Sequence, residues 1–316
     1  MEINNKTYCS LAFAGFDNRE KSVCCFAKLN KKYNSFTEIQ NSQELKTLQN
    51  DLLNGVKNKS CAVCWDWEEY GATSMRGNFI FGKSNEDLKN EVQNKKLKHL
   101  VIDSGNVCNL SCRMCGPGWS TGWFKESNAR GVETFNKEDV VKTDIEALMQ
   151  EDYSELRSVE ILGGEPFMNL EHLKIIKRII DSGNARRCNL SYTTNGTHRP
   201  SPLILDYFKQ FYQVVLNLSI DATGKLFSYI RTGGNWEVIL SNFKFLRYAQ
   251  QKYDNLLLTC HPTIGALNVL QLDELWSWFS EQNLIDRYLQ TTFVVDPKHY
   301  SFSIFNDKQK NDLIKK

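Results

Sequence analysis

The sequence has no large excess of charge of either sign. Lys and Arg number 39, Asp and Glu number 37, and the net charge of the 316 residues is +2. Proteins that bind nucleic acids or anionic membranes through charge carry a strongly basic surface. This balance therefore gives no reason to expect a nucleic acid or a membrane as a partner.

Long apolar runs are missing as well. The first ten residues, MEINNKTYCS, lack the apolar core of a secretory signal peptide. No uninterrupted apolar run approaches the roughly 20 residues that cross a bilayer, and we find no internal repeat or low-complexity segment. A hydrophobic share of 41% is ordinary for a globular protein. We therefore expect a cytoplasmic protein with one large domain and a smaller one.

A fourth cysteine is missing from the loop GNVCNLSCRMCGPGWS, residues 105–120. Cys108, Cys112 and Cys115 are spaced C-x3-C-x2-C, whereas structural zinc sites and electron-transfer clusters normally take four protein ligands. In a reducing compartment, clustered cysteines indicate metal more often than disulfides. Three thiolates suit an iron–sulfur cluster with one iron left open. The alternatives are a zinc loop completed by a distant ligand, or cysteines that only pack.

From about residue 97 the chain alternates short apolar runs with segments of helical periodicity. The expected strands are residues 96–103, 158–164, 188–196, 213–221, 255–262 and 286–295. The expected helices between them are residues 139–150, 170–183, 202–211, 235–251 and 272–282. This alternation predicts an α/β fold with a parallel sheet, either an open barrel of six units or a flat doubly wound sheet.

Polar motifs follow several of these strands. They are the cysteine loop, GGEP at 163–166, TTNG at 193–196 and SID at 219–221. In both candidate folds the chemistry belongs at the carboxyl ends of the strands, so we expect these motifs to meet there. Gly163 and Gly164 would let a ligand approach the backbone closely, and Glu165 is an acceptor suited to an ammonium group.

With GGEP beside it, the cysteine loop resembles the radical S-adenosylmethionine (SAM) superfamily over about residues 97–295. The resemblance implies a partial (β/α)6 barrel of the TIM type over residues 96–296. It also implies a 4Fe–4S cluster on Cys108, Cys112 and Cys115, whose open iron binds SAM. Reductive cleavage of SAM then gives a 5′-deoxyadenosyl radical that abstracts hydrogen from a substrate. An electron donor such as flavodoxin or ferredoxin is implied as a partner.

The same resemblance implies several cofactor-binding positions. Gly163, Gly164, Glu165 and Pro166 form the motif that binds the SAM amino group, and Met114 stands where the family commonly has an aromatic residue near the adenine. The other implied positions are Asn195, Ser219, Asp221 and Arg231, the last matching an arginine that pairs with the SAM carboxylate. The alternatives are an Asn-Gly turn for Asn195 and a surface role for Arg231. Alternation along the strand is expected to put Ser219 and Asp221 on one face, and Cys260 is considered as a hydrogen-atom donor.

Residues 1–95 have a different composition. The runs YCSLAFAGF and KSVCCFAKL suggest a small hairpin, residues 42–55 a helix that ends at Gly55, and residues 82–96 a linker with helical character. This segment has few apolar residues with which to form a core, so a metal cluster would help to stabilise it. We expect a small α+β domain here and a C-terminal extension over residues 297–316.

Five cysteines lie in this N-terminal part: Cys9, Cys24, Cys25, Cys61 and Cys64. With Glu68, Gly71, Ser74 and Arg76 after them, they resemble the twitch domain, the short form of the SPASM domain, placed before the barrel. The resemblance implies an auxiliary 4Fe–4S cluster. Whether Cys24 or Cys25 is a ligand stays open, and a zinc site is the alternative.

Members of the SPASM and twitch group often modify peptides or proteins by cyclisation, epimerisation or maturation. A peptide or protein substrate is therefore the leading expectation, and a carbohydrate or small metabolite is the first alternative. The alternative from another class is a non-catalytic iron–sulfur or zinc-binding interaction protein. A nucleic-acid modifier is the third option, and the near-neutral charge disfavours it.

Overall fold

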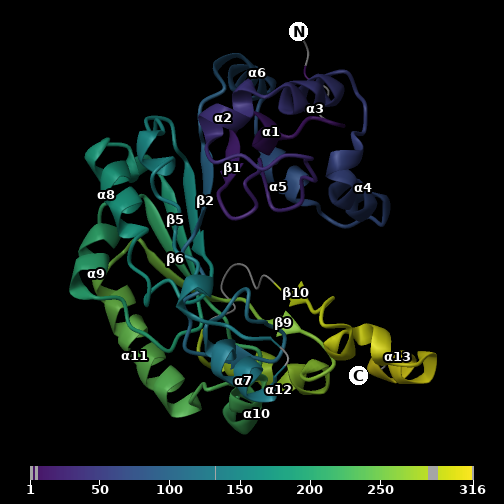
Figure 1. Ribbon diagram of the computed structural model, residues 1–316, viewed down its shortest axis with the longest axis vertical. Coiled ribbons are helices and arrows are strands. Elements are labelled where there is room, and N and C mark those ends of the chain that lie inside the picture. The colour runs from purple at the N-terminus through teal and green to yellow at the C-terminus, as the bar shows by residue number, and fades with distance from the viewer. Residues whose placement is uncertain (1–2, 4–5, 132, 284–290, 315–316) are drawn as a thin grey trace. The chain divides into compact units, whose positions relative to one another are not determined.

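The structure, a computed structural model, describes residues 3, 6–131, 133–283 and 291–314 (Figure 1). The α-helices are α1 Ser10–Ala14, α2 Phe36–Asn41, α3 Gln43–Leu53, α4 Ala62–Glu69, α5 Met75–Ile80, α6 Asn85–Asn94, α7 Gly122–Arg130, α8 Leu173–Asp181, α9 Pro202–Phe208, α10 Gly224–Ile230, α11 Trp236–Lys252, α12 Leu272–Glu281 and α13 Asp307–Ile314. The strands are β1 Gly15–Asp17, β2 His99–Asp103, β3 Ser111–Cys112, β4 Ser158–Leu162, β5 Asn189–Thr194, β6 Gln213–Leu218, β7 Arg231–Thr232, β8 Leu256–Cys260, β9 Thr263–Ile264 and β10 Thr292–Phe293.

Six strands form one parallel sheet in the order β1-β2-β4-β5-β6-β8. From β2 onward the order in the sheet is the order in the chain. A doubly wound sheet reverses its strand order at a switch point, whereas a (β/α) barrel adds each strand beside the previous one. The sequential order therefore confirms the expected α/β fold of partial-barrel type and excludes the doubly wound alternative.

The sixth strand of the sheet is not the expected one. Residues 286–295 contribute only β10, which pairs in parallel with the two-residue strand β9, while residues 284–290 lie outside the described part of the chain. The sheet instead gains β1, which pairs in parallel with β2 from Gly15↔His99 to Asp17↔Val101. A strand of three residues has no periodicity that a sequence pattern could reveal.

Two other expectations were wrong. The run YCSLAFAGF folds as helix α1 followed by strand β1, so the expected N-terminal hairpin does not form. The expected second strand, KSVCCFAKL, makes only the isolated antiparallel bridge Asp17↔Ser22.

The helix expected over residues 139–150 does not form either. At the two ends of this range lie only the 3-10 turns Lys137–Asp139 and Leu148–Gln150. The Asn106 side chain donates to the Asp139 carbonyl at 3.0 Å and accepts from the Val141 N–H at 2.8 Å. These backbone groups therefore form hydrogen bonds with a side chain instead of with the backbone groups of a helix.

Most of the other helices agree with expectation. α3, α8, α11 and α12 fall inside the expected ranges or within a residue of them, and the 82–96 segment contains α6. Gly183 follows α8 with a φ of 76°, as expected of a glycine after a helix C-terminus. No helix in the described residues is both long and apolar enough to span a membrane.

The chain divides into two compact units, which do not coincide with the expected boundaries near residues 95 and 296. The first comprises residues 1–103, 144–160 and 172–189, and the second comprises residues 104–143, 161–171 and 190–316. In the first unit, α1 packs against α3, α5, α6 and β1. The buried carboxylate of Glu91, in α6, connects this helix to the segment before α1. It accepts from the Tyr8 hydroxyl at 2.9 Å and pairs with Lys83 at 2.6 Å.

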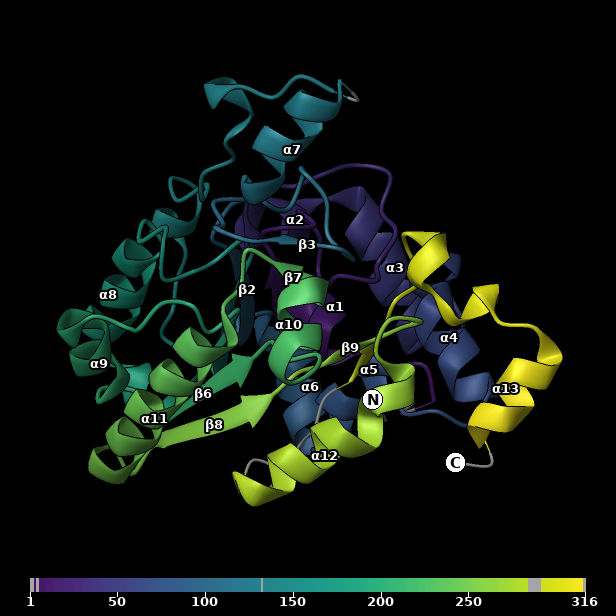
Figure 2. The ribbon, with the colours of Figure 1, turned by 90° about the horizontal axis from the view of Figure 1, so that it is seen from below.

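In the second unit, β6 and β8 lie side by side and α11 packs against β8 (Figure 2). The register runs from Val214↔Leu256 to Leu218↔Cys260, and these four side chains are all buried. Since side chains alternate along a strand, Val215, Asn217, Leu257 and Thr259 face the other side of the sheet, where they are only half-buried. That face also carries the polar residues Ser191 and Thr193 of β5.

Candidate active site

The cysteine loop begins directly after β2 and is held mainly by its own backbone and by neighbouring threonine and serine hydroxyls. Cys112 is buried, while Cys108 and Cys115 are half-buried. The Thr121 hydroxyl bridges the Cys108 backbone, accepting from its N–H at 3.2 Å and donating to its carbonyl at 3.1 Å. Burial raises the pKa of the Cys112 thiol to about 12, and Cys115 and Cys108 also raise it. The three sulfur atoms therefore lie within electrostatic reach of one another.

A short antiparallel ladder holds the loop to the end of α10. β3 pairs with β7, with Ser111 opposite Thr232 and Cys112 opposite Arg231. Arg231 is 8% exposed, so the surface alternative for this residue is wrong. Its Nη1 donates to Cys112 Sγ at 3.8 Å, and its Nε lies 2.8 Å from Asp221 Oδ2 in a buried ion pair.

The GGEP motif lies against the cysteine loop through backbone contacts. The Gly164 N–H donates to the Gly105 carbonyl and the Glu165 N–H to the Val107 carbonyl, both at 2.7 Å. A Cβ added to Gly164 would lie 2.4 Å from the Val107 oxygen, so only glycine fits at this position. The glycines were expected to let a ligand approach the backbone closely. In the structure, the close approach at Gly164 is made by the backbone of the cysteine loop.

Glu165 is fully buried and its carboxylate is extensively hydrogen-bonded. It accepts from the Thr194 hydroxyl at 2.7 Å, the Asn195 N–H at 2.8 Å and the Phe167 N–H at 3.2 Å. Burial raises its pKa to about 7, against these hydrogen bonds, which lower it. A carboxylate offers about four acceptor positions, so one remains for a ligand.

Asn195 connects Glu165 to the cysteine loop. Its Nδ2 donates to Cys108 Sγ at 3.6 Å and to Asn109 Oδ1 at 3.1 Å. Its Oδ1 accepts from the backbone N–H of Thr197 at 2.9 Å, and because that N–H can only donate, the orientation of the amide is determined.

The expected alternation of Ser219 and Asp221 is wrong, because β6 ends at Leu218, before both residues. Ser219 is half-buried and its N–H donates to the Thr194 carbonyl at 2.8 Å. Asp221 is 1% exposed and accepts from the Thr263 N–H at 2.7 Å in addition to pairing with Arg231. Asp221 therefore acts within the protein, as the partner of Arg231.

The remaining expected residues have simpler environments. Met114 is half-buried and Pro166 is buried. Cys260 is buried in register with Leu218, on the face of β8 that packs away from the half-buried side, which disfavours it as a hydrogen donor to a substrate. Sequence reasoning missed Thr194 and Asn109, although each directly adjoins a residue it had chosen.

A family model for the radical SAM superfamily matches residues 102–267, just over half of the chain. The chain belongs to the radical SAM superfamily. It is therefore a radical SAM enzyme by family, and the family implies a 4Fe–4S cluster and SAM. No curated protein matches the chain significantly.

Solved structures with a similar fold include other radical SAM proteins. Native anSMEcpe with bound AdoMet and the Cp18Cys peptide is 15% identical, with a TM-score of 0.43, over 62% of this chain and 50% of that one. SuiB of Streptococcus suis bound to S-adenosylmethionine is 16% identical, with a TM-score of 0.43, over 86% of this chain and 59% of that one. This radical SAM protein thus spans about half the length of those chains, and the likeness concerns the fold alone.

The donor set of the cysteine loop fits the cluster that the family implies. Three thiols come from one loop, as a cluster with one open iron requires. Among the described residues, no three His, Cys, Asp or Glu side chains are arranged around a single metal position. The thiolates of a cuboidal cluster bind separate irons, so they do not need to converge on one point.

The five N-terminal cysteines of the radical SAM protein lie in the first compact unit. Burial raises the pKa of Cys9 to about 11 and Cys64 also raises it, while Cys9 raises the pKa of both Cys24 and Cys61. Cys64 also raises the pKa of Cys61, and Cys25 raises that of Cys24. Burial raises the pKa of Cys25 to about 12, but the nearby charges that act on it are Asp17, Arg19 and Glu160, and its thiol contacts Met75 Sδ at 3.9 Å.

The residues expected to accompany these cysteines also meet. Arg76 Nε donates to Glu68 Oε1 at 2.9 Å, and the Ser74 hydroxyl donates to the same oxygen at 2.5 Å. Arg76 Nη1 donates to the Tyr8 carbonyl at 2.9 Å, next to Cys9. Gly71 lies after α4 with a φ of 75°.

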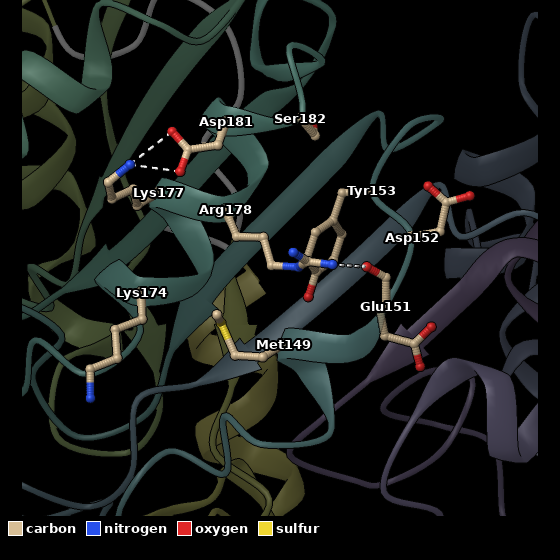
Figure 3. A pocket seen from close by; sticks show the side chains of 9 residues that line it. All are labelled: Met149, Glu151, Asp152, Tyr153, Lys174, Lys177, Arg178, Asp181 and Ser182. Carbon is tan, nitrogen blue, oxygen red and sulfur yellow. Dashed lines mark hydrogen bonds and ion pairs between the residues drawn. The ribbon is translucent and has the colours of Figure 1, made fainter.

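A hollow of about 500 Å³ in the first unit is unrelated to these residues (Figure 3). It is lined by Met149, Glu151, Asp152, Tyr153, Lys174, Lys177, Arg178, Asp181 and Ser182. Its charges are used within the protein: Lys177 pairs with Asp181 at 2.6 Å, and Arg178 donates to the Glu151 carbonyl at 3.4 Å. None of the expected site residues lines it.

Proposed function

We propose that this radical SAM enzyme holds its 4Fe–4S cluster on Cys108, Cys112 and Cys115 and abstracts hydrogen from a peptide or protein. The observation that carries the proposal is the convergence of strand-end segments on the cysteine loop within one compact unit. GGEP contacts it through backbone hydrogen bonds, Asn195 contacts Cys108 and Arg231 contacts Cys112. When bound, the cluster and SAM supply the 5′-deoxyadenosyl radical.

The protein's own residues position and shield this centre. The backbone bonds of Gly164 and Glu165 hold the motif that would receive the amino group of SAM, and the remaining acceptor position of Glu165 suits that ammonium. Trp123 Nε1 donates to the Cys112 carbonyl at 3.1 Å, so its indole covers the loop near the buried thiol. Exclusion of water protects a reactive centre from side reactions.

A peptide substrate is supported by hydroxyl and amide groups on the half-buried face of the sheet. In the second unit this face carries the polar Ser191, Thr193, Asn217 and Thr259 beside the apolar Val215 and Leu257, and the Thr259 hydroxyl donates to Asn217 Oδ1 at 2.5 Å. Neutral hydroxyl and amide groups hydrogen-bond to the amides of a peptide and also to the hydroxyls of a carbohydrate. The peptide is preferred because twitch-type enzymes often act on peptides, and the carbohydrate is the alternative.

The first experiment is anaerobic reconstitution with iron, sulfide, SAM and a strong reductant. The enzyme should release 5′-deoxyadenosine, Cys112→Ala should release none, and Cys188→Ala should behave as the wild type because Cys188 is a buried cysteine in the other unit. A loaded cluster without this product would favour the non-catalytic alternative. Peptides encoded beside the gene and carbohydrates are then compared by their stimulation of the product and by their own change in mass.

We propose further that Cys9, Cys24, Cys61 and Cys64 hold an auxiliary 4Fe–4S cluster with four protein ligands. Cys9 raises the pKa values of Cys24 and Cys61, and Cys64 raises those of Cys9 and Cys61, which supports this grouping. Lys28 N–H donates to the Ser60 carbonyl at 2.9 Å, which holds the segment after Cys24 beside the residue before Cys61. Cys25 is left out of the proposed group because the charges that act on its own pKa are Asp17, Arg19 and Glu160, although it also raises the pKa of Cys24.

Adjacent cysteines provide a matched test of this assignment. After anaerobic reconstitution, Cys24→Ala should lose close to half of the bound iron, while Cys25→Ala should keep the wild-type content of about eight irons. Equal iron loss in both variants, or loss only in Cys25→Ala, would contradict the assignment. Zinc in place of iron would establish the zinc alternative for this site.

A further inference from the structure

Two hydrogen-bond donors from different segments of the chain, one after β5 and one in β7, reach sulfur atoms of the cysteine loop. Asn195 Nδ2 lies 3.6 Å from Cys108 Sγ, and Arg231 Nη1 lies 3.8 Å from Cys112 Sγ. Both distances are within the range of N–H···S hydrogen bonds, which are longer than those to oxygen because sulfur is larger. Both donors are buried, Asn195 at 6% exposure and Arg231 at 8%.

The Asn195 donor is held in one orientation. Its Oδ1 accepts from the Thr197 N–H at 2.9 Å and the Thr197 hydroxyl at 2.6 Å, so the Nδ2 hydrogens must point the other way, toward Cys108. The backbone is held too, because the Asn195 N–H donates to Glu165. Glu165 is therefore a positioning residue for this amide.

The Arg231 donor is held by Asp221 and by the ladder. Its Nε is paired with Asp221 at 2.8 Å, and the Cα partners Cys112 and Arg231 lie opposite each other in the β3–β7 pair. The guanidinium is charged at every accessible pH. A buried cation thus contacts one sulfur and a neutral amide contacts another.

Reduction of an iron–sulfur cluster adds negative charge to its sulfur atoms. Hydrogen bonds and positive charge at the thiolates stabilise the reduced form more than the oxidised form, and hydrogen bonds to sulfur are among the factors that set cluster potentials. Burial strengthens the effect because the local dielectric constant is low.

We propose that Asn195 and Arg231 raise the reduction potential of the cluster by donating to Cys108 and Cys112, and that Asp221 and Glu165 position these two donors. The inference rests on the proposed cluster at these cysteines. It assigns to Arg231 a role at the cluster itself, in addition to the expected contact with the carboxylate of SAM.

The test is a potentiometric titration of the reconstituted full-length enzyme, followed by electron paramagnetic resonance. Asn195→Ala removes the amide, and Asn195→Asp keeps the acceptor for Thr197 while removing the donor, so at least one of them should retain the fold. At the wild-type midpoint potential, both should lower the ratio of reduced to oxidised cluster, by on the order of tenfold, or about 59 mV for one electron.

A matched control is Asn184→Ala. Asn184 lies in the other unit, is 5% exposed and donates to the Tyr153 and Leu156 carbonyls at 3.0 and 2.6 Å, and no contact with a cysteine is found for it in the described residues. Its potential should equal that of the wild type. For the second donor, the double variant Asp221→Asn with Arg231→Gln removes both charges together and should also lower the potential.

The possible outcomes distinguish a failure of this inference from a failure of the proposed function. Intact clusters with the potential of the control in the Asn195 variants and in the double variant would overturn this inference and leave the proposed function standing. A wild-type enzyme that forms no cluster on the central loop would overturn the proposed function and this inference with it. A cluster whose spectrum does not respond to SAM would overturn the proposed function alone.

Discussion

Glu165 is a fully buried carboxyl group whose protonation should change near neutral pH. Burial raises its pKa to about 7, while the hydrogen bonds from Thr194, Asn195 and Phe167 act in the opposite direction. The perturbation we consider is Glu165→Gln, which keeps the size of the side chain and removes its titration. The variant tests whether burial outweighs the three hydrogen bonds.

The magnitude follows from the pKa difference between the folded and unfolded chain. A value of about 7 against an ordinary 4.5 corresponds to about 3 kcal/mol, at 1.36 kcal/mol for each pKa unit. The folded state holds the proton more tightly, so this contribution to the free energy of unfolding is fully present below pH 4.5. It is lost as the pH rises through about 7.

Two measurements check this prediction on metal-free protein. Infrared spectra recorded against pH should contain a protonated-carboxyl signal that disappears near pH 7 in the wild type and is absent in Glu165→Gln. In urea unfolding, the wild type should lose about 3 kcal/mol relative to the variant between pH 4.5 and pH 8. The new amide of the variant faces the Asn195 N–H, and this penalty is the same at each pH, so it cancels in the comparison.

The control for this prediction is Glu160→Gln. Burial also raises the pKa values of Asp17 and Glu160, so both contribute to the signal of the wild type. The component assigned to Glu165 must persist in Glu160→Gln. If the wild type and Glu165→Gln titrate identically between pH 5 and pH 8, the reasoning is refuted.

Two further predictions concern the contacts around the cysteine loop. Gly164→Ala should reduce the iron retained on the central loop after reconstitution, since its Cβ would lie 2.4 Å from the Val107 oxygen and such overpacking costs about 1–3 kcal/mol or more. Gly116→Ala, with nothing within 4 Å of the new Cβ, is its control, and equal iron in both would contradict the argument. Asp221→Asn should lower the free energy of unfolding by about 3–5 kcal/mol because it strands the buried Arg231 charge. Arg130→Ala, which breaks the exposed pair with Glu126, should change it by only about 0.5 kcal/mol or less, and similar losses in the two would refute the claim that burial decides.

Features of this sequence could be predicted where a residue type, a spacing or a period is compatible with only one local structure. The C-x3-C-x2-C spacing, the GGEP turn and the helices around residues 170–183 and 235–251 could be found without a structure. Positive φ at Gly183 was also foreseeable, since the residue follows the last apolar position of a helix. Each of these depends on neighbours within a few positions in the chain.

The predictions of local structure that were wrong share one physical cause, which is an interaction with a distant part of the chain. Residues 139–150 have helical spacing, but the side chain of Asn106, more than 30 positions earlier, takes backbone groups there that a helix would use. Strand β1 is three residues long and exists because β2 pairs with it. In both cases a distant segment of the chain decides the local conformation.

The sequence alone determined the family, the spacing of the cysteines and the alternation that gives a partial barrel, because these depend on composition, spacing and period. Only the tertiary structure decided that Arg231 is buried against Cys112 and that Asn195 points at Cys108. Directions of side chains and pairings between distant segments are set by packing and hydrogen bonding in three dimensions, which no spacing in the chain encodes.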